Sequence, residues 1–208
     1  IKGAPHEVAA SNINPYLVDA PDVALESRRE PICKVPPIVF GSMPNDGGHL
    51  LLSDEEKKQL TKAEPAGRNW IRPFVGADEF LSNIPRWCLW LKDCPPGQLK
   101  RMPEVMQHVE GVRKHRAESK RPTTRELAKT PALFGEDRQP STNYLLIPSV
   151  SSERRPFIPV GFMTADVIAS NLVLVVPGAT EYHFGIISST MHNAWMRYVA
   201  GRLESRYR

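Results

Sequence analysis

The chain has 208 residues, of which 41% are hydrophobic and 24% are charged, and its formal net charge is +4. This composition is typical of a globular chain that can bury a core, and no stretch approaches the roughly 20 apolar residues that a membrane span requires, which excludes the membrane classes. Three cysteines at irregular spacing are too few for a disulfide-stapled secreted module, which favours the reducing cytoplasm.

The first part of the chain is rich in proline and is expected to be a linker. Pro5, Pro15, Pro21 and Pro31 punctuate this segment of residues 1–36, and the short apolar run at 16–18 predicts an edge strand. Because the chain opens with Ile1 instead of Met and lacks a signal-peptide pattern, we expect this segment to join an upstream domain of a longer protein. Residues 37–208 are then expected to form one domain.

Turn and helix signals follow in chain order. The cluster at 44–48 contains Asn, Asp and Gly, which supply the positive φ values of tight turns. Ser53 and Glu56 have the spacing of a capping box, which predicts a short helix ending near Ala63. The alternation of apolar side chains over 86–91 predicts a strand.

A basic helix occupies the middle of the chain. Apolar residues recur every three or four positions over 99–112, which predicts a helix with one buried face. Residues 100–129 carry nine Lys or Arg and four Glu, a local excess of five positive charges. Arg113, Arg116 and Lys120 continue the helical spacing, so their side chains are expected to project to one side.

The last third of the chain favours strands and a closing helix. Ser189 is expected to cap a helix reaching about Arg202, with an apolar stripe of Met191, Trp195, Val199 and Leu203 packed on a sheet. The fold class is therefore α+β, with a curved, mainly antiparallel sheet, short flanking helices, a C-terminal helix and Pro-rich loops. Four short β-favouring runs at 144–147, 157–162, 172–176 and 182–187 are predicted to form most of that sheet.

Fragments of catalytic motifs are incomplete. Asn14–Tyr16 is one proline short of the Asn-Pro-Pro-Tyr turn with which amino-group DNA methyltransferases hold a flipped adenine. Asp46, Glu55 and Lys57 imitate the metal site of many nucleases, but Glu55 and Lys57 lie in the first turn of the predicted helix. No Gly-rich phosphate loop follows a strand. We assign no catalytic residue, no metal ligand and no cofactor to the chain itself.

Cys88 and Cys94 lack a second pair of ligands at zinc spacing, so both are interpreted as packing residues. His183 and His192 flank two serines without a nucleophile motif, and are interpreted as structural or surface residues.

The basic segment at 100–129 and the predicted hairpin at 151–155 carry side chains of the types that bind phosphate. Arg and Lys displace counterions from nucleic acid, and Ser adds a short neutral donor. The alternative is a solvated helix end with surface ion pairs. The candidate phosphate contacts are Arg113, Arg116, Ser119, Lys120, Arg121, Arg125, Ser151 and Ser152.

Short loops closed by prolines supply candidate base readers. Arg suits guanine and Gln suits adenine in the major groove, and a rigid loop can hold either against a base edge. Glu153 either accepts from cytosine or orients the arginines beside it. The candidates are Arg138, Gln139, Glu153, Arg154 and Arg155.

Five segments have distinctive amino-acid sequences that are unlike common motifs: Ile13–Pro21, Phe40–Gly48, Leu133–Glu136, Ser151–Arg155 and Phe184–Ser189. In this order they resemble the target recognition domain of MmeI-like DNA methyltransferases, including the type IIL restriction-modification enzymes. The resemblance spans nearly the whole chain.

The resemblance implies a module that recognises a sequence in double-stranded DNA and positions an adenine for N6 methylation by an upstream domain. It implies S-adenosylmethionine as the cofactor of the parent enzyme, often a nuclease in the same polypeptide, and a bacterial cytoplasmic location. It also implies that the basic helix end and the Ser151–Arg155 hairpin contact DNA. The competing hypothesis is a protein-interaction module whose Pro-rich loops dock a partner subunit.

Overall fold

The computed structural model describes residues 7–15, 17, 19–24, 26, 30–203 and 206–207. The chain divides into two units, one up to Val35 and one from Pro36 onward. In the first unit Ile13 and Asp19 form an isolated antiparallel bridge, and Ser11 Oγ donates to the Asp19 carboxylate at 3.0 Å. Tyr16 and Val18 of the predicted edge strand lie outside the described residues. The role of residues 1–36 as a linker stays a prediction.

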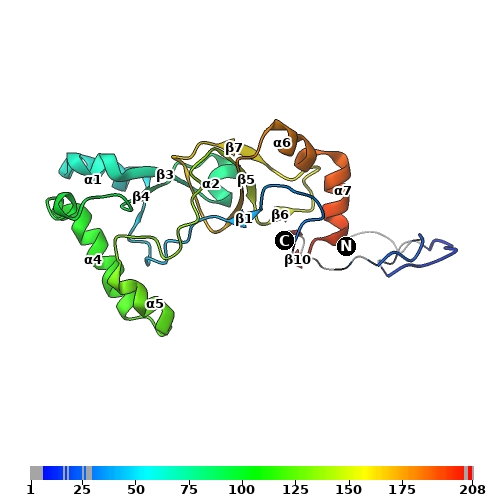
Figure 1. Cartoon of the computed structure of the whole chain (residues 1–208), viewed down its shortest axis with the longest axis horizontal. Coiled ribbons are helices and arrows are strands. Elements are labelled where there is room, and N and C mark those ends of the chain that lie inside the picture. Colours follow the sequence, from blue (N-terminus) through cyan, green and yellow to red (C-terminus); the bar gives the residue numbers. More distant parts are fainter. Residues whose placement is uncertain are drawn as a thin grey trace. The chain divides into compact units, whose positions relative to one another are not determined.

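The second unit contains a four-stranded antiparallel sheet in the order β1-β9-β5-β7 (Figure 1). Its strands are β1 (Val39–Phe40), β5 (Tyr144–Pro148), β7 (Gly161–Met163) and β9 (Val173–Pro177). Every residue of β5 is buried, because Leu145 and Ile147 enter one apolar cluster and Tyr144 and Leu146 enter another. The sheet is therefore covered on both faces at its centre.

A second four-stranded sheet has the order β2-β4-β3-β8, and a three-stranded sheet has the order β10-β11-β6. β3 and β8 pair in parallel, and the other described strand pairs are antiparallel. The strands are β2 (Leu51–Leu52), β3 (Ile71–Val75), β4 (Trp87–Leu89), β6 (Ser151–Ser152), β8 (Ile168–Ala169), β10 (Arg202–Leu203) and β11 (Arg206–Tyr207). These sheets and the helices between them confirm the α+β class and its mainly antiparallel pairing.

The helices are short, and several begin at proline. Pro96, Pro103 and Pro122 each start a helix, where the missing N–H leaves no hydrogen bond unmade. The elements are α1 (Asp54–Ala63), η1 (Pro65–Trp70), α2 (Ala77–Ser82), α3 (Pro96–Leu99), α4 (Pro103–Ala117), α5 (Pro122–Glu126), η2 (Leu127–Lys129), α6 (Glu181–Ser188) and α7 (Thr190–Val199). Within the part of the chain that the structure describes, none of the helices combines the length and the apolar character needed to cross a bilayer.

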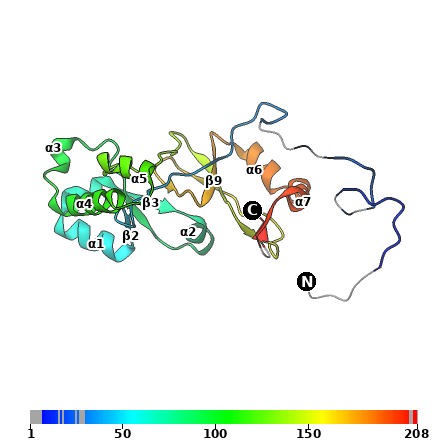
Figure 2. The same ribbon diagram turned by 90° about the horizontal axis from the view of Figure 1, so that it is seen from below.

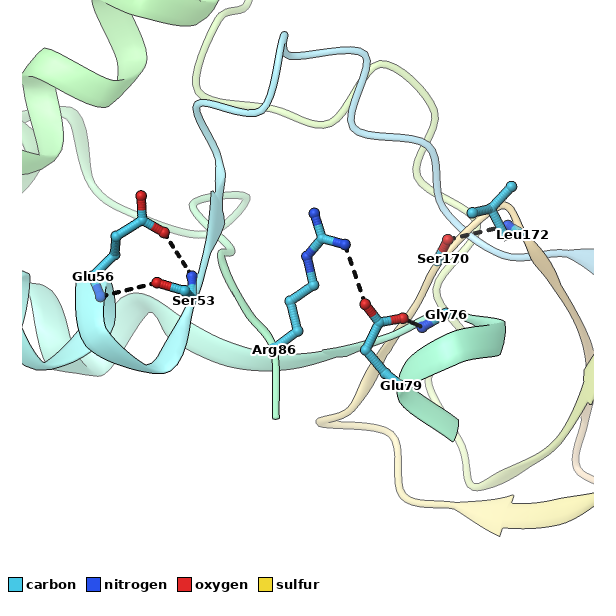
Figure 3. A network of polar contacts seen from close by, with 7 residues as sticks. All are labelled: Ser53, Glu56, Gly76, Glu79, Arg86, Ser170 and Leu172. Atoms are coloured by element: carbon cyan, nitrogen blue, oxygen red, sulfur yellow. Dashed lines mark hydrogen bonds and ion pairs between the residues drawn. The ribbon is translucent and has the colours of Figure 1, made fainter. Parts of the chain in front are cut away.

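Side-chain caps fix the first turns of two helices near the second sheet (Figure 3). Ser53 Oγ accepts from Glu56 N at 3.2 Å, and the Glu56 carboxylate accepts from Ser53 N at 2.7 Å, as predicted. Glu79 plays the same part for α2 by accepting from Gly76 N at 2.9 Å, and its second oxygen accepts from Arg86 at 3.1 Å. The Glu79 carboxylate thus joins the start of α2 to Arg86.

The largest apolar cluster lies between α4 and the second sheet. Val105, Val109 and Val112 of α4 are buried there against Leu52 and Leu89. Figure 2 shows α4 between α1 and α5. The amphipathic helix predicted over 99–112 is confirmed from Pro103 onward, whereas Leu99 ends the separate helix α3 and Lys120 lies beyond the last residue of α4. The buried face of α4 fixes the direction in which its C-terminal end points.

The C-terminal predictions were partly wrong. The run 182–187, predicted as a strand, is helix α6, because Thr180 caps its first turn and the residues after Gly178 leave the sheet. Of the run 157–162, Gly161 and Phe162 lie in β7. The closing helix begins after Ser189 as predicted but ends at Val199.

The buried face of α7 is also different from the predicted one. Met191 and Trp195 are 84% and 52% exposed, whereas Asn193 is 3% exposed. Asn193 Nδ2 donates to Ser189 O at 2.8 Å, and its Oδ1 accepts from Ile158 N at 2.7 Å, so hydrogen bonding sets the rotation of the helix. His192, Met196 and Ala200 face a cavity of about 180 Å³ beside the first sheet.

Truncation of a central residue of β5 tests this core. Leu146→Ala should lower the free energy of unfolding by about 2–5 kcal/mol, because Leu146 is fully buried between strands. The measurement is urea denaturation followed by circular dichroism. Leu172→Ala is the matched control, since Leu172 is 60% exposed, and it should change stability by about 0.5 kcal/mol or less. Equal losses in the two variants would contradict the assignment of the core.

Candidate nucleic-acid interface

Arg116 is the most deeply buried of the predicted contact residues. Its exposed fraction is 0%, and all five of its guanidinium N–H donors have a carbonyl partner. The prediction that Arg116 projects to solvent and contacts phosphate is therefore wrong. The acceptors are Pro44 O (2.8 Å), Asn45 O (2.9 Å), Leu127 O (3.0 Å), Thr130 O (2.9 Å) and Leu133 O (2.7 Å).

The periodicity of the helix explains this result. Val109 and Val112 precede Arg116 at helical spacing and are buried, so Arg116 continues the buried face and not the exposed one. Burial lowers the pKa of the guanidinium from its ordinary value, while the charge of Asp46 opposes this change. A guanidinium stays charged in proteins, and carbonyl dipoles on five sides stabilise the charge here.

The loop at 44–45, whose carbonyls bind Arg116, is also joined to the segment 135–138 by main-chain hydrogen bonds. Gly135 N donates to Pro44 O at 3.0 Å, and Met43 and Glu136 exchange two hydrogen bonds. Arg138 N then donates to Ser42 Oγ at 3.0 Å. The segment from Gly135 to Arg138 is therefore fixed to the same loop as α4.

The basic junction between α4 and α5 displays two free cations. Lys120 and Arg121 are exposed, and their side chains make no hydrogen bond or ion pair with the residues that the structure describes. Arg125 Nη1 donates to Ser119 O at 2.9 Å and to Lys120 O at 3.1 Å, which fixes the turn between the helices. Ser119 Oγ accepts from Arg121 N at 3.2 Å. The junction thus holds its cations on an ordered turn.

Arg113 lies on the exposed face of α4, where its Nε donates to Glu110 at 3.0 Å. This pair is exposed and screened by solvent, so it leaves Arg113 able to exchange partners.

The two neighbours Arg138 and Gln139 differ sharply. Arg138 is exposed and pairs with the Glu136 carboxylate. The amide of Gln139 is used internally: Nε2 donates to Ala165 O and Val167 O, and Oε1 accepts from Ala169 N, at 2.8–3.0 Å. The prediction that the Gln139 amide is free to read a base is therefore wrong.

The hairpin after β6 presents charged side chains at its tip. Glu153 and Arg154 are exposed and Arg155 is half-buried. Ser152 Oγ accepts from Arg154 N at 3.2 Å. Ser151 is buried where β6 pairs with β11, so the prediction that it contacts phosphate is wrong.

Helix α7 holds this hairpin in place. Arg197 Nη2 donates to Arg155 O and Pro156 O, each at 2.9 Å, and Asn193 accepts from Ile158 N. The sequence prediction missed both residues because it assigned the buried face to the apolar stripe. The signal was the spacing of Asn193 and Arg197, four residues apart on one helical face.

Two of the three residues that imitate a nuclease site, Asp46 and Lys57, make structural contacts. The Asp46 carboxylate is buried and accepts from Leu50 N at 2.5 Å and Gly48 N at 3.1 Å, which closes the turn at 46–50. The Lys57 ammonium lies over the Trp87 ring, 2.9 Å from its centroid. Among the described residues there is no group of three His, Cys, Asp or Glu placed to hold a metal ion.

The cysteines and C-terminal histidines make packing and capping contacts. Cys88 is buried, and burial raises the pKa of its thiol well above the ordinary value. His183 Nδ1 accepts from Thr180 N at 3.0 Å, and His192 Nδ1 lies 2.9 Å from Ile187 O. These contacts agree with their interpretation as structural residues.

Comparison with known proteins places this arrangement in a family. The family model described as "MmeI, target recognition domain" matches residues 19–208. The chain belongs to this family. The assignment confirms the resemblance found in the sequence.

Two similar proteins have names that indicate their function. DNA methyltransferase A of Bacillus subtilis (strain 168) is 40% identical over 199 residues, which are 95% of this chain and 22% of that protein. A solved structure of the type IIL restriction-modification enzyme MmeI in complex with DNA is 48% identical and superposes with a TM-score of 0.91, over 99% of this chain and 28% of that one. The chain thus spans about a quarter of the length of these relatives.

Replacement of Arg116 tests its structural role. Arg116→Ala should lower the free energy of unfolding by about 3–5 kcal/mol, because five main-chain carbonyl oxygens lose the guanidinium that joins their segments to α4. Arg116→Lys should recover part of this loss, since an ammonium has three donors. Arg113→Ala on the exposed face is the control and should change stability by about 0.5 kcal/mol or less in urea denaturation. A loss for Arg116→Ala as small as the control's would show that the carbonyl cage is dispensable.

Proposed function

We propose that the chain recognises a specific sequence in double-stranded DNA on behalf of an adenine-N6 DNA methyltransferase. The observation that carries the proposal is the match to MmeI, a protein solved in complex with DNA, at 48% identity and a TM-score of 0.91. The surface agrees with this role, because Lys120 and Arg121 are free cations on an ordered turn and can each replace a counterion on a phosphate.

The proposed phosphate contacts are revised by burial. Arg113, Lys120 and Arg121 remain, since their charges reach solvent. Ser119, Arg125 and Ser152 contribute mainly by shaping the turns that display these cations, because their polar groups already bond within the chain. Arg116 and Ser151 are removed from the set.

The proposed base readers are Arg138, Arg154 and Arg155, with Glu153 beside them. Arg138 extends from a segment whose main chain is fixed to Ser42, and Arg154 and Arg155 extend from a hairpin held by Arg197. A planar guanidinium on a fixed main chain can donate two parallel hydrogen bonds to guanine in the major groove. The Glu136 carboxylate orients Arg138 in the same way that Glu153 is expected to orient its neighbours.

Catalysis is assigned to another part of the polypeptide. The two relatives are about four times longer than the matched region, and one is named as a DNA methyltransferase. We assign residues 1–36 to the connection with an upstream methyltransferase domain, and residues 37–208 to the recognition domain. S-adenosylmethionine would bind in the upstream domain, and the whole enzyme would act in the bacterial cytoplasm.

Removal of the free cations tests DNA binding. The double variant Lys120→Ala/Arg121→Ala should bind duplex DNA more weakly, and the slope of log K against log salt should fall in magnitude by about 1.8, since two phosphate contacts are lost. The measurement is fluorescence anisotropy of a labelled duplex at several salt concentrations.

The control for this variant is Lys62→Ala/Arg68→Ala, which removes two exposed cations from α1 and η1. It should leave the slope nearly unchanged. If neither double variant changes DNA affinity, the α4–α5 junction does not bind phosphate. An interaction of the wild-type chain with a protein and not with DNA would favour the protein-interaction module.

Base reading has a separate test. Arg138→Ala and Arg154→Ala should each cost about 1–3 kcal/mol on the preferred site and relax the preference at one base pair. Selection from a randomised duplex library, followed by sequencing, measures the preference of each variant. Unchanged preferences in both variants would exclude these loops as readers.

A further inference from the structure

An exposed turn between β7 and β8 is held by several hydrogen bonds to its main chain. Thr164 to Val167 form the turn, which is closed by a hydrogen bond from Val167 N to Thr164 O at 3.1 Å. Gln139 adds three bonds to the main chain of this turn and of the strand after it, through Ala165 O, Val167 O and Ala169 N. All the donors of one side-chain amide are thus committed to one short segment.

Tyr144 holds the same turn through the Val167 carbonyl, which also accepts from Gln139. Its hydroxyl donates to Val167 O at 2.6 Å, and the residue itself is completely buried in β5. Burial raises the pKa of this hydroxyl well above its ordinary value, so it keeps its proton and remains a donor throughout the neutral range. Because surface turns are usually mobile, two polar side chains directed at one turn indicate that its position matters.

The turn shares a support with the proposed base reader Arg138. Ser42 N donates to Ala169 O at 2.7 Å, and Ser42 Oγ accepts from Arg138 N at 3.0 Å. Arg138 is also the residue before Gln139 in the chain. The exposed side chains of the turn and of Arg138 therefore belong to one rigid neighbourhood.

The turn displays one free carboxylate in this neighbourhood. Asp166 is exposed, and its side chain has no hydrogen bond or ion pair with the residues described. A carboxylate on a surface that meets DNA is repelled by phosphate, and its favourable partner there is an exocyclic amino group. In the major groove the acidic side chains accept from the N4 amino group of cytosine.

We propose that the Thr164–Val167 turn is a base-reading element in which Asp166 accepts a hydrogen bond from cytosine N4. Gln139 and Tyr144 are its positioning residues. This inference rests on the proposed function, since it requires that the chain recognises DNA.

The test measures sequence preference in the complete natural polypeptide that contains these 208 residues. Duplexes bound from a randomised library are sequenced for the wild type and for Asp166→Asn. The variant should lose discrimination at one C·G base pair by about 10-fold or more, because the amide presents a donor as well as an acceptor. Asp93→Asn is the matched control, as it removes the same charge from another exposed loop.

Gln139→Leu tests the positioning role. It removes two hydrogen bonds to the turn and one to β8, and should relax the preference at the same base pair as Asp166→Asn. The double variant should then lose little more than either single one, because the two residues act through one contact. A merely structural Gln139 would lower the melting temperature and leave the base preference unchanged, and a Gln139 that reads a base itself would affect a different base pair.

The outcomes separate this inference from the proposed function. If the wild type enriches no sequence, the proposed function fails. If the wild type enriches a site and Asp166→Asn enriches the same site with equal discrimination, the reading turn is refuted while DNA recognition stands. Loss of discrimination at an A·T pair would refute the assignment to cytosine.

Discussion

The buried guanidinium of Arg116 is the constraint on which the loops around α4 depend. A cation without solvent is costly unless every donor has a partner, and here five carbonyls from two loops meet that need. The cation is therefore satisfied only when α4, the loop at 44–45 and the segment 127–133 are all in place. One residue links formation of the core to the ordering of loops that the core does not cover.

This linkage explains how a chain with many prolines and short strands displays fixed loops. Pro44 O in the loop at 44–45 accepts a hydrogen bond from Gly135 N, which fixes the segment that follows. Ser42 Oγ then accepts from Arg138 N and fixes the end of that segment. Separately, α7 fixes the hairpin at 151–158 with Asn193 and Arg197. Long loops usually lose definition with distance from a sheet. Here Arg116 of α4, and Asn193 and Arg197 of α7, bond directly to the backbone of the loops.

The sequence predicted features whose cause is local. The capping box of Ser53 and Glu56, the amphipathic helix before Arg113 and the class of fold follow from short-range patterns, and all were confirmed. The burial of Arg116 was missed because residue type outweighed helical periodicity in the prediction. The exposure of Trp195 was missed because Asn193, four residues from Ser189 and distant in sequence from Ile158, orients α7 through contacts that no local pattern contains.

The supports share one chemical property. Arg116, Arg125 and Arg197 donate to main-chain carbonyl oxygens, and the Gln139 amide bonds three main-chain groups. Every amino acid, proline included, carries a carbonyl, so the supports do not depend on which side chains the loops display. Residues at the loop tips are free to change over generations while the backbone beneath them keeps its shape. Such a scaffold allows the DNA sequence preference to change by substitution at the loop tips without a change in the backbone that holds them.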